Sequence, residues 1–260
     1  MSELVTIERQ GPLMLIGVNR ADKRNAWNLE IIEAVARAYT ELAADNALRV
    51  GVVFGHGADF TAGLDLANVA PALASGKLAN VMPADLCDPW DFLGKPCPKP
   101  IVLAVQGRCF TLGIELSLAS QVVIAAEDTE FAQLEVARGI FPFGGATLRL
   151  GTRLGLRGLQ WLLTAETFTA AQALEAGLVS EVVPVGFQLE RAVAVARRIG
   201  AMAPLAVQAS LASFRAAERA ARDAALQQLQ SDFPTILGSQ DAQEGLAAMM
   251  ERRDPAFTGK

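Results

Sequence analysis

Short apolar runs that alternate with helical segments are the feature that most constrains this chain. Three such runs, VGVVFG, IVLAVQG and QVVIAA, occupy residues 50–55, 101–107 and 121–126. Apolar runs of this length, bounded by glycine or proline, predict buried β-strands. LVTIER and LMLIGVNR predict a hairpin with its turn at residues 10–12, and an amphipathic helix is expected over residues 29–44. The alternation predicts an α/β fold, and 260 residues suffice for one large domain or two smaller ones.

The second half of the chain has a helical pattern from about Leu156 onward. Thr169 and Gln172 fit a capping box at the start of one helix, and Gly177 fits the end of that helix. The run LVSEVVP interrupts the pattern as a strand. Residues 187–253 are mostly alanine-rich, with apolar residues at helical spacing, which we interpret as core and subunit packing.

Composition and the first residues exclude several classes of protein. Hydrophobic residues make up 52% of the chain, yet no uncharged apolar run reaches the roughly 18 residues that a membrane span needs. The start, MSELVTIERQ, has no basic segment followed by an apolar one, so no secretory signal is expected. Cys87, Cys97 and Cys109 match neither a disulfide framework nor a zinc site. We therefore expect a cytoplasmic protein.

Charge and histidine content narrow the chemistry. The net charge of −5 disfavours nucleic acid as a partner, because phosphate binding relies on clustered lysine and arginine. Histidine-rich metal sites and most nucleophile–histidine systems would have to use His56, the single histidine. We interpret His56, which lies between two glycines, as a loop residue without a chemical role. The sequence also lacks GxSxG, P-loop and GxGxxG motifs.

Glu115 stands in an almost wholly apolar stretch, GRCFTLGIELSLASQVVIAA, at residues 107–126. A buried polar group without partners costs about 2 to 7 kcal/mol, so a carboxylate here needs a partner or a task. A helix is expected to start near Gly113, with Glu115 in its first turn. The N–H groups of that turn lack intrahelical partners and carry the positive end of the helix dipole, which suits an oxyanion or a carboxylate.

A second acid, Glu135, lies between Leu134 and Val136 in FAQLEVARGIF. Two carboxylates in partly apolar surroundings are typical of general acid/base catalysis, because burial raises their pKa values toward neutral pH. The alternative explanation for each glutamate is a buried ion pair with an arginine such as Arg138 or Arg149.

The stretch IVLAVQGRCFTLGIELSLASQVVIAAEDTEFAQLEVARGIFPFGGATLRLGTRLG, together with RNAWN and GHGADFTAGLDL upstream, resembles the enoyl-CoA hydratase/isomerase (crotonase) family. These motifs follow in consistent order and spacing. The resemblance implies a crotonase-like spiral of ββα units over residues 1–195 that holds an acyl-CoA site. It also implies a C-terminal helical region over residues 196–260 that mediates homotrimers, often paired into homohexamers.

The resemblance also implies roles for individual residues. The backbone N–H groups of Leu64 and Leu112 hold the thioester carbonyl, Glu115 delivers the oxygen of water to C3, and Glu135 protonates C2. Lys23 and Arg24 are candidate partners of the CoA phosphates. The other expected substrate contacts are Ala26, Ala62, Asp65 and Leu66. Coenzyme A is part of the substrate, so neither a cofactor nor a metal is expected.

The expected function is that of an enoyl-CoA hydratase, which forms a 3-hydroxyacyl-CoA from a 2-enoyl-CoA. The main alternative is a Δ3,Δ2-enoyl-CoA isomerase, which can use an acid at the Glu135 position alone. Thioester hydrolysis, a catalytically silent acyl-CoA-binding protein and a scaffold with an RNA-binding surface are further alternatives. Both glutamates disfavour a silent protein, and the net charge disfavours RNA.

Several positions depart from the pattern of many family hydratases. Thr111-Leu112-Gly113 stands where a run of glycines is common, which leaves the acyl-chain specificity open, and Ala21 and Leu134 stand where prolines are common. Phe141 and Phe143 either narrow the acyl pocket or pack in the core.

Overall fold

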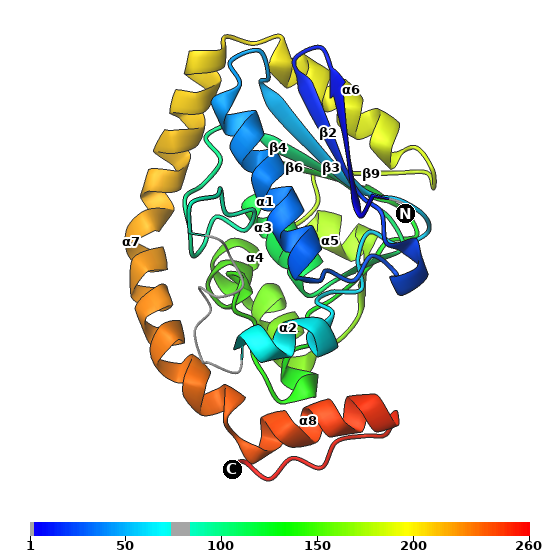
Figure 1. Cartoon of the computed structure of the whole chain (residues 1–260), viewed down its shortest axis with the longest axis vertical. Helices are drawn as coiled ribbons and strands as arrows, with labels where there is room; N and C mark the ends of the chain where they lie inside the picture. The colour runs from blue at the N-terminus through cyan, green and yellow to red at the C-terminus, as the bar shows by residue number, and fades with distance from the viewer. Residues whose placement is uncertain (1–2, 74–83) are drawn as a thin grey trace.

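The computed structural model describes residues 3–73 and 84–260, and its centre is a six-stranded sheet (Figure 1). The strand order is β1-β2-β3-β4-β6-β9, with β1 and β2 antiparallel and the remaining neighbours parallel. The strands are β1 (Val5–Gln10), β2 (Leu13–Val18), β3 (Val50–Gly55), β4 (Ile101–Val105), β6 (Val122–Ala126) and β9 (Glu181–Val183). The predicted hairpin and buried strands are therefore confirmed.

Helices cover both faces of this sheet. Helix α1 (Leu29–Ala44), which has the predicted bounds, packs its apolar side on one face, and helix α6 (Gln188–Gly200) packs on the other. Asn28 caps α1, because its side chain accepts a hydrogen bond from the N–H of Ile31. Strands buried on both faces read as continuous apolar runs, which explains the sequence pattern of β3, β4 and β6.

The chain follows a spiral course because it alternates between the large sheet and a second, smaller one. The smaller sheet contains β5 (Arg108–Phe110), β7 (Glu130–Ala132) and β8 (Phe168–Thr169), in that order. Twice the chain passes from a strand of the large sheet to one of the small sheet and then to a helix: β4, β5 and α3 (Leu112–Ala119), then β6, β7 and α4 (Ala146–Thr164). A bridge between Thr61 and Cys109 places the segment after β3 beside the small sheet, and α2 (Leu66–Leu73) follows it. The predicted spiral of ββα units is confirmed.

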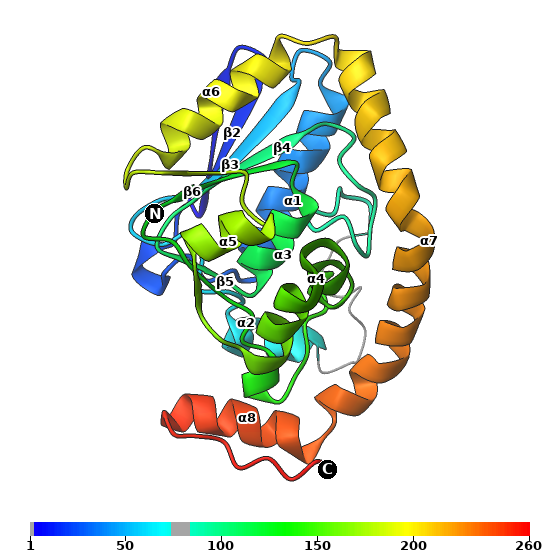
Figure 2. The ribbon, with the colours of Figure 1, turned by 180° about the vertical axis from the view of Figure 1, so that it is seen from behind.

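Three further helices complete the described chain. Helix α5 (Ala170–Ala176) has the predicted capping box of Thr169 and Gln172 and ends at Gly177 in the left-handed region. Helix α7 (Pro204–Leu237), about 51 Å long at 1.5 Å per residue, runs along one side of the molecule. Helix α8 (Gln240–Glu251) crosses the end that lies opposite α6 (Figure 2). The predicted division near residue 195 falls within α6 and stays a prediction.

The structure departs from the sequence-based expectation in several elements. The short strands β5, β7 and β8 and the helix α2 were not predicted from the sequence. Helix α3 starts at Leu112, one position before the expected Gly113. Helix α4 starts at Ala146, well before Leu156. Gly155, with φ 63° and ψ −151°, divides α4 into two helical segments, and the helical pattern expected from Leu156 onward corresponds to the second of them. Three glycines in α4 weaken its helical pattern in the sequence.

Candidate active site

Three of the predicted site residues follow the small sheet at equivalent places. Leu64 follows the bridge at Thr61, Leu112 follows β5, and Glu135 follows β7. Because Thr61, β5 and β7 are neighbours in parallel pairing, the chain leaves them on the same side of the small sheet. The spiral therefore gathers residues that lie far apart in the sequence.

The backbone at Leu64 leaves its N–H group without an acceptor. Trp27 forms an isolated parallel bridge with Leu64: the Trp27 N–H donates to the Gly63 carbonyl at 2.9 Å, and the Asp65 N–H donates to the Trp27 carbonyl at 2.8 Å. In this pattern the N–H of Leu64 points away from Trp27. No described residue accepts a hydrogen bond from it.

The N–H group of Leu112 lies on the adjacent turn, and it too has no acceptor in the described part of the chain. Leu112 is the first residue of α3, and the preceding Thr111 gives no side-chain cap to the helix. The turns of Leu64 and Leu112 touch, because a Cβ atom added to Gly63 would lie 2.2 Å from the Thr111 Oγ1. The contact also requires the unusual backbone of both residues, with φ 106° at Gly63 and 49° at Thr111.

Glu115 is 5% exposed and is held by a second helix start. Its Oε1 accepts hydrogen bonds from the N–H groups of Gly144, at 2.7 Å, and Ala146, at 3.2 Å, and Ala146 is the first residue of α4. Burial raises the pKa of Glu115 to about 7, while these two hydrogen bonds and the charge of Arg149 act in the opposite direction. The structure therefore favours ionised Glu115 more than burial alone would.

Glu135 is 7% exposed, and the charge of Glu115 acts on its carboxyl group. Burial, followed by the negative charge of Glu115, raises the pKa of Glu135 to about 8. The Gln133 side chain donates to the Glu135 Oε2 at 3.1 Å. The field of Glu115 therefore favours a proton on Glu135 when Glu115 is ionised.

The alternative explanation by buried ion pairs is not supported in the described part of the chain. Arg149 donates to the carbonyl groups of Trp90, at 2.7 Å, and Asp91, at 2.6 Å, and its guanidinium lies 4.0 Å from the Asp91 carboxylate. Neither Arg149 nor Arg138 forms an ion pair within 4.0 Å of Glu115 or Glu135 among the described residues. Their charges act on the two glutamates only from a longer range.

The predicted substrate contacts form one strip beside the Leu64 turn. The Ala62 N–H donates to the Arg24 carbonyl at 2.9 Å, which joins residues 62–66 to the loop of Lys23 and Arg24. Lys23 and Arg24 are exposed. The Asp65 carboxylate pairs with Arg20 at 2.8 Å, and Arg20 also donates to the Ala26 carbonyl. Asp65 therefore braces this strip, and Leu66 begins α2.

A cavity of about 460 Å³, which we call the α2–α8 cavity, is lined by residues that lie close in sequence to the site residues, although neither Glu115 nor Glu135 lines it. Leu66, Phe143 and residues from the end of α7 and from α8 line it. Phe143 precedes Gly144, the partner of Glu115, and its ring packs edge-on against Phe233 of α7 at 5.3 Å. Phe141 also packs on Phe233, at 6.3 Å, but lines a different cavity.

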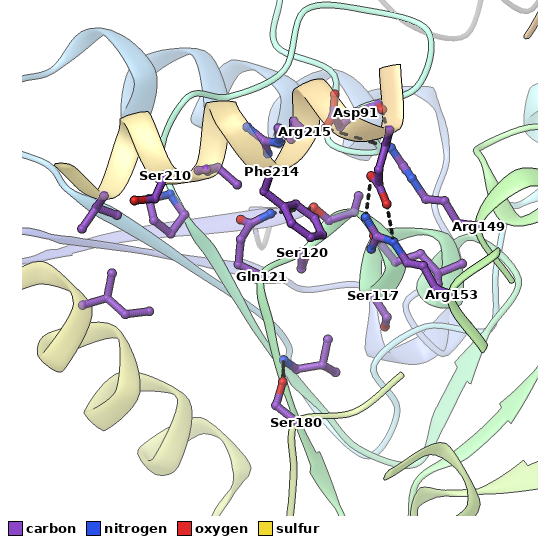
Figure 3. A pocket seen from close by; sticks show the side chains of 18 of the residues that line it. Asp91, Ser117, Ser120, Gln121, Arg149, Arg153, Ser180, Ser210, Phe214 and Arg215 are labelled. Carbon is purple, nitrogen blue, oxygen red and sulfur yellow. Dashed lines mark hydrogen bonds and ion pairs between the residues drawn. The ribbon is translucent and has the colours of Figure 1, made fainter. Parts of the chain in front are cut away.

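A larger cavity, of about 960 Å³, lies between α7 and the core and contains neither glutamate (Figure 3). Ion pairs cross it: Arg215 of α7 lies 3.0 Å from Asp91, and Arg153 of α4 pairs with Glu218 of α7 at 2.8 Å. Arg215 also donates to the Cys97 carbonyl at 2.7 Å. This cavity is part of the attachment of α7 to the core.

The other reactive side chains lie apart from the glutamates. His56 contacts Thr6, with 2.8 Å between its Nε2 and the threonine Oγ1, and its ring lies tilted against that of Phe54. The three cysteines are buried and free. Within residues 3–73 and 84–260, no group of three or more His, Cys, Asp or Glu side chains could hold a metal ion. No helix in these ranges combines the length and hydropathy needed to cross a bilayer.

Sequence reasoning missed the residues that hold Glu115. Gly144 and Ala146 act through backbone N–H groups, which leave no mark in side-chain chemistry. The only sequence signal is the glycine pair of FPFGGA, because a Cβ atom on Gly144 would lie 2.5 Å from the Glu115 Oε2. No sequence feature indicates the role of Arg20, whose guanidinium forms an ion pair with Asp65.

A ββα spiral with two buried carboxyl groups beside two free N–H groups defines a class of acid/base enzyme scaffold. The chain matches the family described as enoyl-CoA hydratase/isomerase over residues 8–260. It is 33% identical to the 2,3-dehydroadipyl-CoA hydratase of Escherichia coli K12, with all of both chains covered. It is also 32% identical to an enoyl-CoA hydratase of Mycobacterium tuberculosis, with 98% of this chain and 96% of that one covered.

Solved structures agree with this match. A probable enoyl-CoA hydratase/isomerase from Mycobacterium abscessus shares 43% identity and a TM-score of 0.81, with 99% of each chain covered. A carnitinyl-CoA hydratase from Mycobacterium avium shares 36% identity and a TM-score of 0.87 over the whole of both chains. The protein therefore belongs to the enoyl-CoA hydratase/isomerase family, as the sequence resemblance predicted.

Proposed function

We propose that this protein is an enoyl-CoA hydratase that adds water to a 2-enoyl-CoA thioester and forms a 3-hydroxyacyl-CoA. The observation that carries the proposal is the burial of two glutamates, Glu115 and Glu135, of which Glu115 accepts hydrogen bonds from two backbone N–H groups. The names of the relatives support a hydratase. These relatives include dehydroadipyl-CoA and carnitinyl-CoA enzymes, so their names do not indicate which acyl group this protein binds.

The two free N–H groups bind the thioester carbonyl in this mechanism. Leu64 and Leu112 lie on touching turns, which supports a role of both donors at one oxygen atom. The negative charge that develops on this oxygen during addition is stabilised by donors that are already oriented, and the N-terminal end of α3 adds its dipole. Loss of one such donor typically costs about 3 to 4 kcal/mol of barrier stabilisation.

The two glutamates take different roles because their surroundings differ. Ionised Glu115, which accepts two N–H hydrogen bonds, removes a proton from water as the water oxygen bonds to C3. Protonated Glu135 gives its proton to C2, and the electron pair of the C2–C3 double bond forms the new C2–H bond. Each cycle leaves Glu115 protonated and Glu135 ionised, and a proton passes between them or through solvent to restore the starting state.

The remaining contacts follow the same proposal. Lys23 and Arg24 meet the CoA phosphates, while Ala26 and the strip from Ala62 to Leu66 lie along the nucleotide and its arm. Coenzyme A arrives with the substrate, so the reaction needs no separate cofactor. We also propose that the protein is cytoplasmic and forms a homotrimer or homohexamer.

Glutamine substitutions separate hydration from isomerisation. Glu135→Gln should abolish both activities, because each reaction needs an acid at this position. Glu115→Gln should lower hydration of a 2-enoyl-CoA by about 10² to 10⁴ and spare more of any 3-enoyl-CoA isomerisation. Steady-state rates on both thioesters measure this, with the exposed Glu127→Gln as the matched control. If Glu115→Gln hydrates as fast as the parent, Glu115 is a structural acid and the hydratase mechanism is wrong.

A further inference from the structure

The α2–α8 cavity is placed to receive the far end of an acyl group, if the proposed function holds. Leu66 lies two residues beyond the Leu64 N–H, and Phe143 adjoins the residue that holds Glu115. Arg138, also in its lining, ends the short 3-10 turn Val136–Arg138 that directly follows Glu135. The wall of the cavity therefore contains residues two or three positions from Leu64 and from Glu135, and one residue next to Gly144, which donates to Glu115.

Among the described residues that line this cavity, all are apolar except Arg138 and Gln243. Aliphatic and aromatic side chains from α2, α7 and α8 form most of the wall, with Leu66, Phe233, Leu237, Leu246 and Met249 among them. Such a wall suits the methylene groups of an acyl chain. An arginine in it needs a separate explanation, because burying a cation without a partner is unfavourable.

Arg138 lacks a paired acid. Every aspartate and glutamate of the chain lies in the described ranges, and none forms an ion pair with Arg138 within 4.0 Å. No described residue accepts a hydrogen bond from its guanidinium either. By contrast, Arg149, Arg153 and Arg215 each donate to protein carbonyl or carboxylate groups. Among the described residues, the guanidinium of Arg138 therefore has no acceptor that a ligand would have to displace.

We propose that Arg138 binds a carboxylate at the far end of the acyl group, so that 2-enoyl thioesters of short dicarboxylic acids are favoured substrates. A guanidinium presents paired N–H donors that match a carboxylate. Arg138 lies three positions after Glu135, about 6 Å along a 3-10 turn, so the carboxylate must be only a few carbons from C2. A cationic acyl terminus would be repelled.

A role of Arg138 as counter-ion of Glu135 alone is the competing explanation. The two charges do interact, since the charge of Arg138 lowers the pKa of Glu135 against the effect of burial. A counter-ion acts on every substrate equally, whereas a carboxylate subsite acts only on substrates that carry the second acid. Two thioesters of equal chain length therefore distinguish the explanations.

The test compares hex-2-enoyl-CoA with the hex-2-enedioic acid monothioester of CoA, which differ only in the terminal carboxylate. We expect the parent enzyme to favour the dicarboxylic thioester in kcat/KM by about tenfold to a hundredfold, the worth of a charged hydrogen-bonded pair. Arg138→Gln should bring the ratio close to one, and Arg138→Lys should restore part of it, because lysine keeps the charge but not the paired donors. The exposed Arg198→Gln is the matched control and should leave the ratio unchanged.

Two results overturn the proposal: a parent enzyme without preference for the dicarboxylic thioester, or an Arg138→Gln variant that slows both thioesters equally. Binding of the saturated analogues adipoyl-CoA and hexanoyl-CoA separates this proposal from the hydratase mechanism. If adipoyl-CoA binds more tightly, and only with Arg138 present, while neither enoyl thioester is hydrated, the subsite stands and the proposed reaction is wrong. If the two analogues bind equally and both enoyl thioesters are hydrated, the proposed reaction stands and the subsite is wrong.

Discussion

The carboxyl group of Glu135 is held where ionisation is unfavourable. Water reaches little of it, and the negative charge of Glu115 raises its pKa further, while the charge of Arg138 has a smaller opposite effect. An acid that keeps its proton near neutral pH can act as a proton donor, and the same surroundings that provide this property reduce the stability of the fold. Catalytic tuning and stability should therefore conflict at this residue.

Glu135→Gln should stabilise the protein at alkaline pH. The folded-state pKa of about 8 lies above the ordinary value of 4.5, so the folded protein keeps a proton that the unfolded chain releases. The parent therefore loses stability as pH rises between these values and no further above about 8. We expect the free energy of unfolding of the variant to exceed that of the parent by about 1 to 3 kcal/mol near pH 9 and to differ little near pH 5. The expected gain is smaller than the full pKa difference implies, because part of the raised pKa comes from the charge of Glu115.

Urea unfolding at fixed protein concentration measures this difference at both pH values. Glu127→Gln is the control, because the Glu127 side chain is exposed and its substitution should give no pH-dependent difference. A Glu135→Gln variant that is equally or less stable than the parent near pH 9 would show that ionised Glu135 has a compensating partner.

At the residue scale, the sequence predicted the reactive groups but not what holds them. Glu115 and Glu135 were found because each is an acid with apolar neighbours. The donors at Gly144 and Ala146 belong to a loop 29 to 31 positions beyond Glu115, and only the folded spiral brings that loop back. Arg138 was considered as a partner of the glutamates, and its place in the wall of a cavity emerged only from the packing of α8.

At the element scale, the start of α4 fixes the geometry of Glu115 at the start of α3. Gly144→Ala should disrupt this arrangement, because its Cβ atom would lie 2.5 Å from one carboxylate oxygen and 2.8 Å from the carboxyl carbon. The carboxylate must then move or rotate. A misplacement of about 1 Å at a catalytic group can cost about a hundredfold in rate, and we expect at least this loss in kcat.

Gly151→Ala provides the matched control within α4. An added Cβ atom there meets nothing within 4 Å, so activity should stay at the parent level. Stability should rise by about 0.5 to 1 kcal/mol, because alanine favours a helix over glycine. Rates and urea midpoints of the two variants, measured together, test the argument; a Gly144→Ala enzyme of full activity would contradict it.

Elements with strong local signals were predictable, and those defined by partners were not. Helix α1 has a capping asparagine and a regular apolar face, and α5 has a capping box, so their bounds were found. Strands β5, β7 and β8 have only two or three residues each, and pairing with each other defines them. The start of α4 was obscured by its glycines, which serve the kink at Gly155 and the close approach of Gly158 to the Leu150 carbonyl.

At the scale of the whole molecule, α7 and α8 bring the end of the chain back to the site. Gly245 of α8 packs against backbone, because an added Cβ atom would lie 2.2 Å from the Arg138 carbonyl oxygen, and Gly139 approaches Asp241 equally closely. The C-terminal helices therefore support the turn that carries Glu135 and Arg138. The sequence predicted helices here, but their course depends on contacts that helical spacing does not specify.

The surface of a single chain carries several large apolar side chains that are exposed to solvent. Leu156, Leu159 and Leu163 share one side of α4 by their spacing, with Leu156 84% exposed and Leu163 64% exposed, and Leu205 at the start of α7 is 80% exposed. Each leucine gains about 1.5 to 3 kcal/mol when it is fully buried. Exposed apolar side chains that share one side of a helix are candidates for an interaction site, and a second copy of the chain is the partner that our proposal names.

Light scattering should therefore give three or six times the chain mass of 27.5 kDa at micromolar concentration. The double variant Leu156→Glu/Leu163→Glu should lower the measured mass, because two carboxylates in an apolar contact must be desolvated. Ala194→Glu, on the exposed side of α6, should leave the mass unchanged. A parent protein with the mass of one chain would contradict the predicted assembly, and an unchanged mass in the double variant would place the contact on another surface, with the start of α7 the next to test.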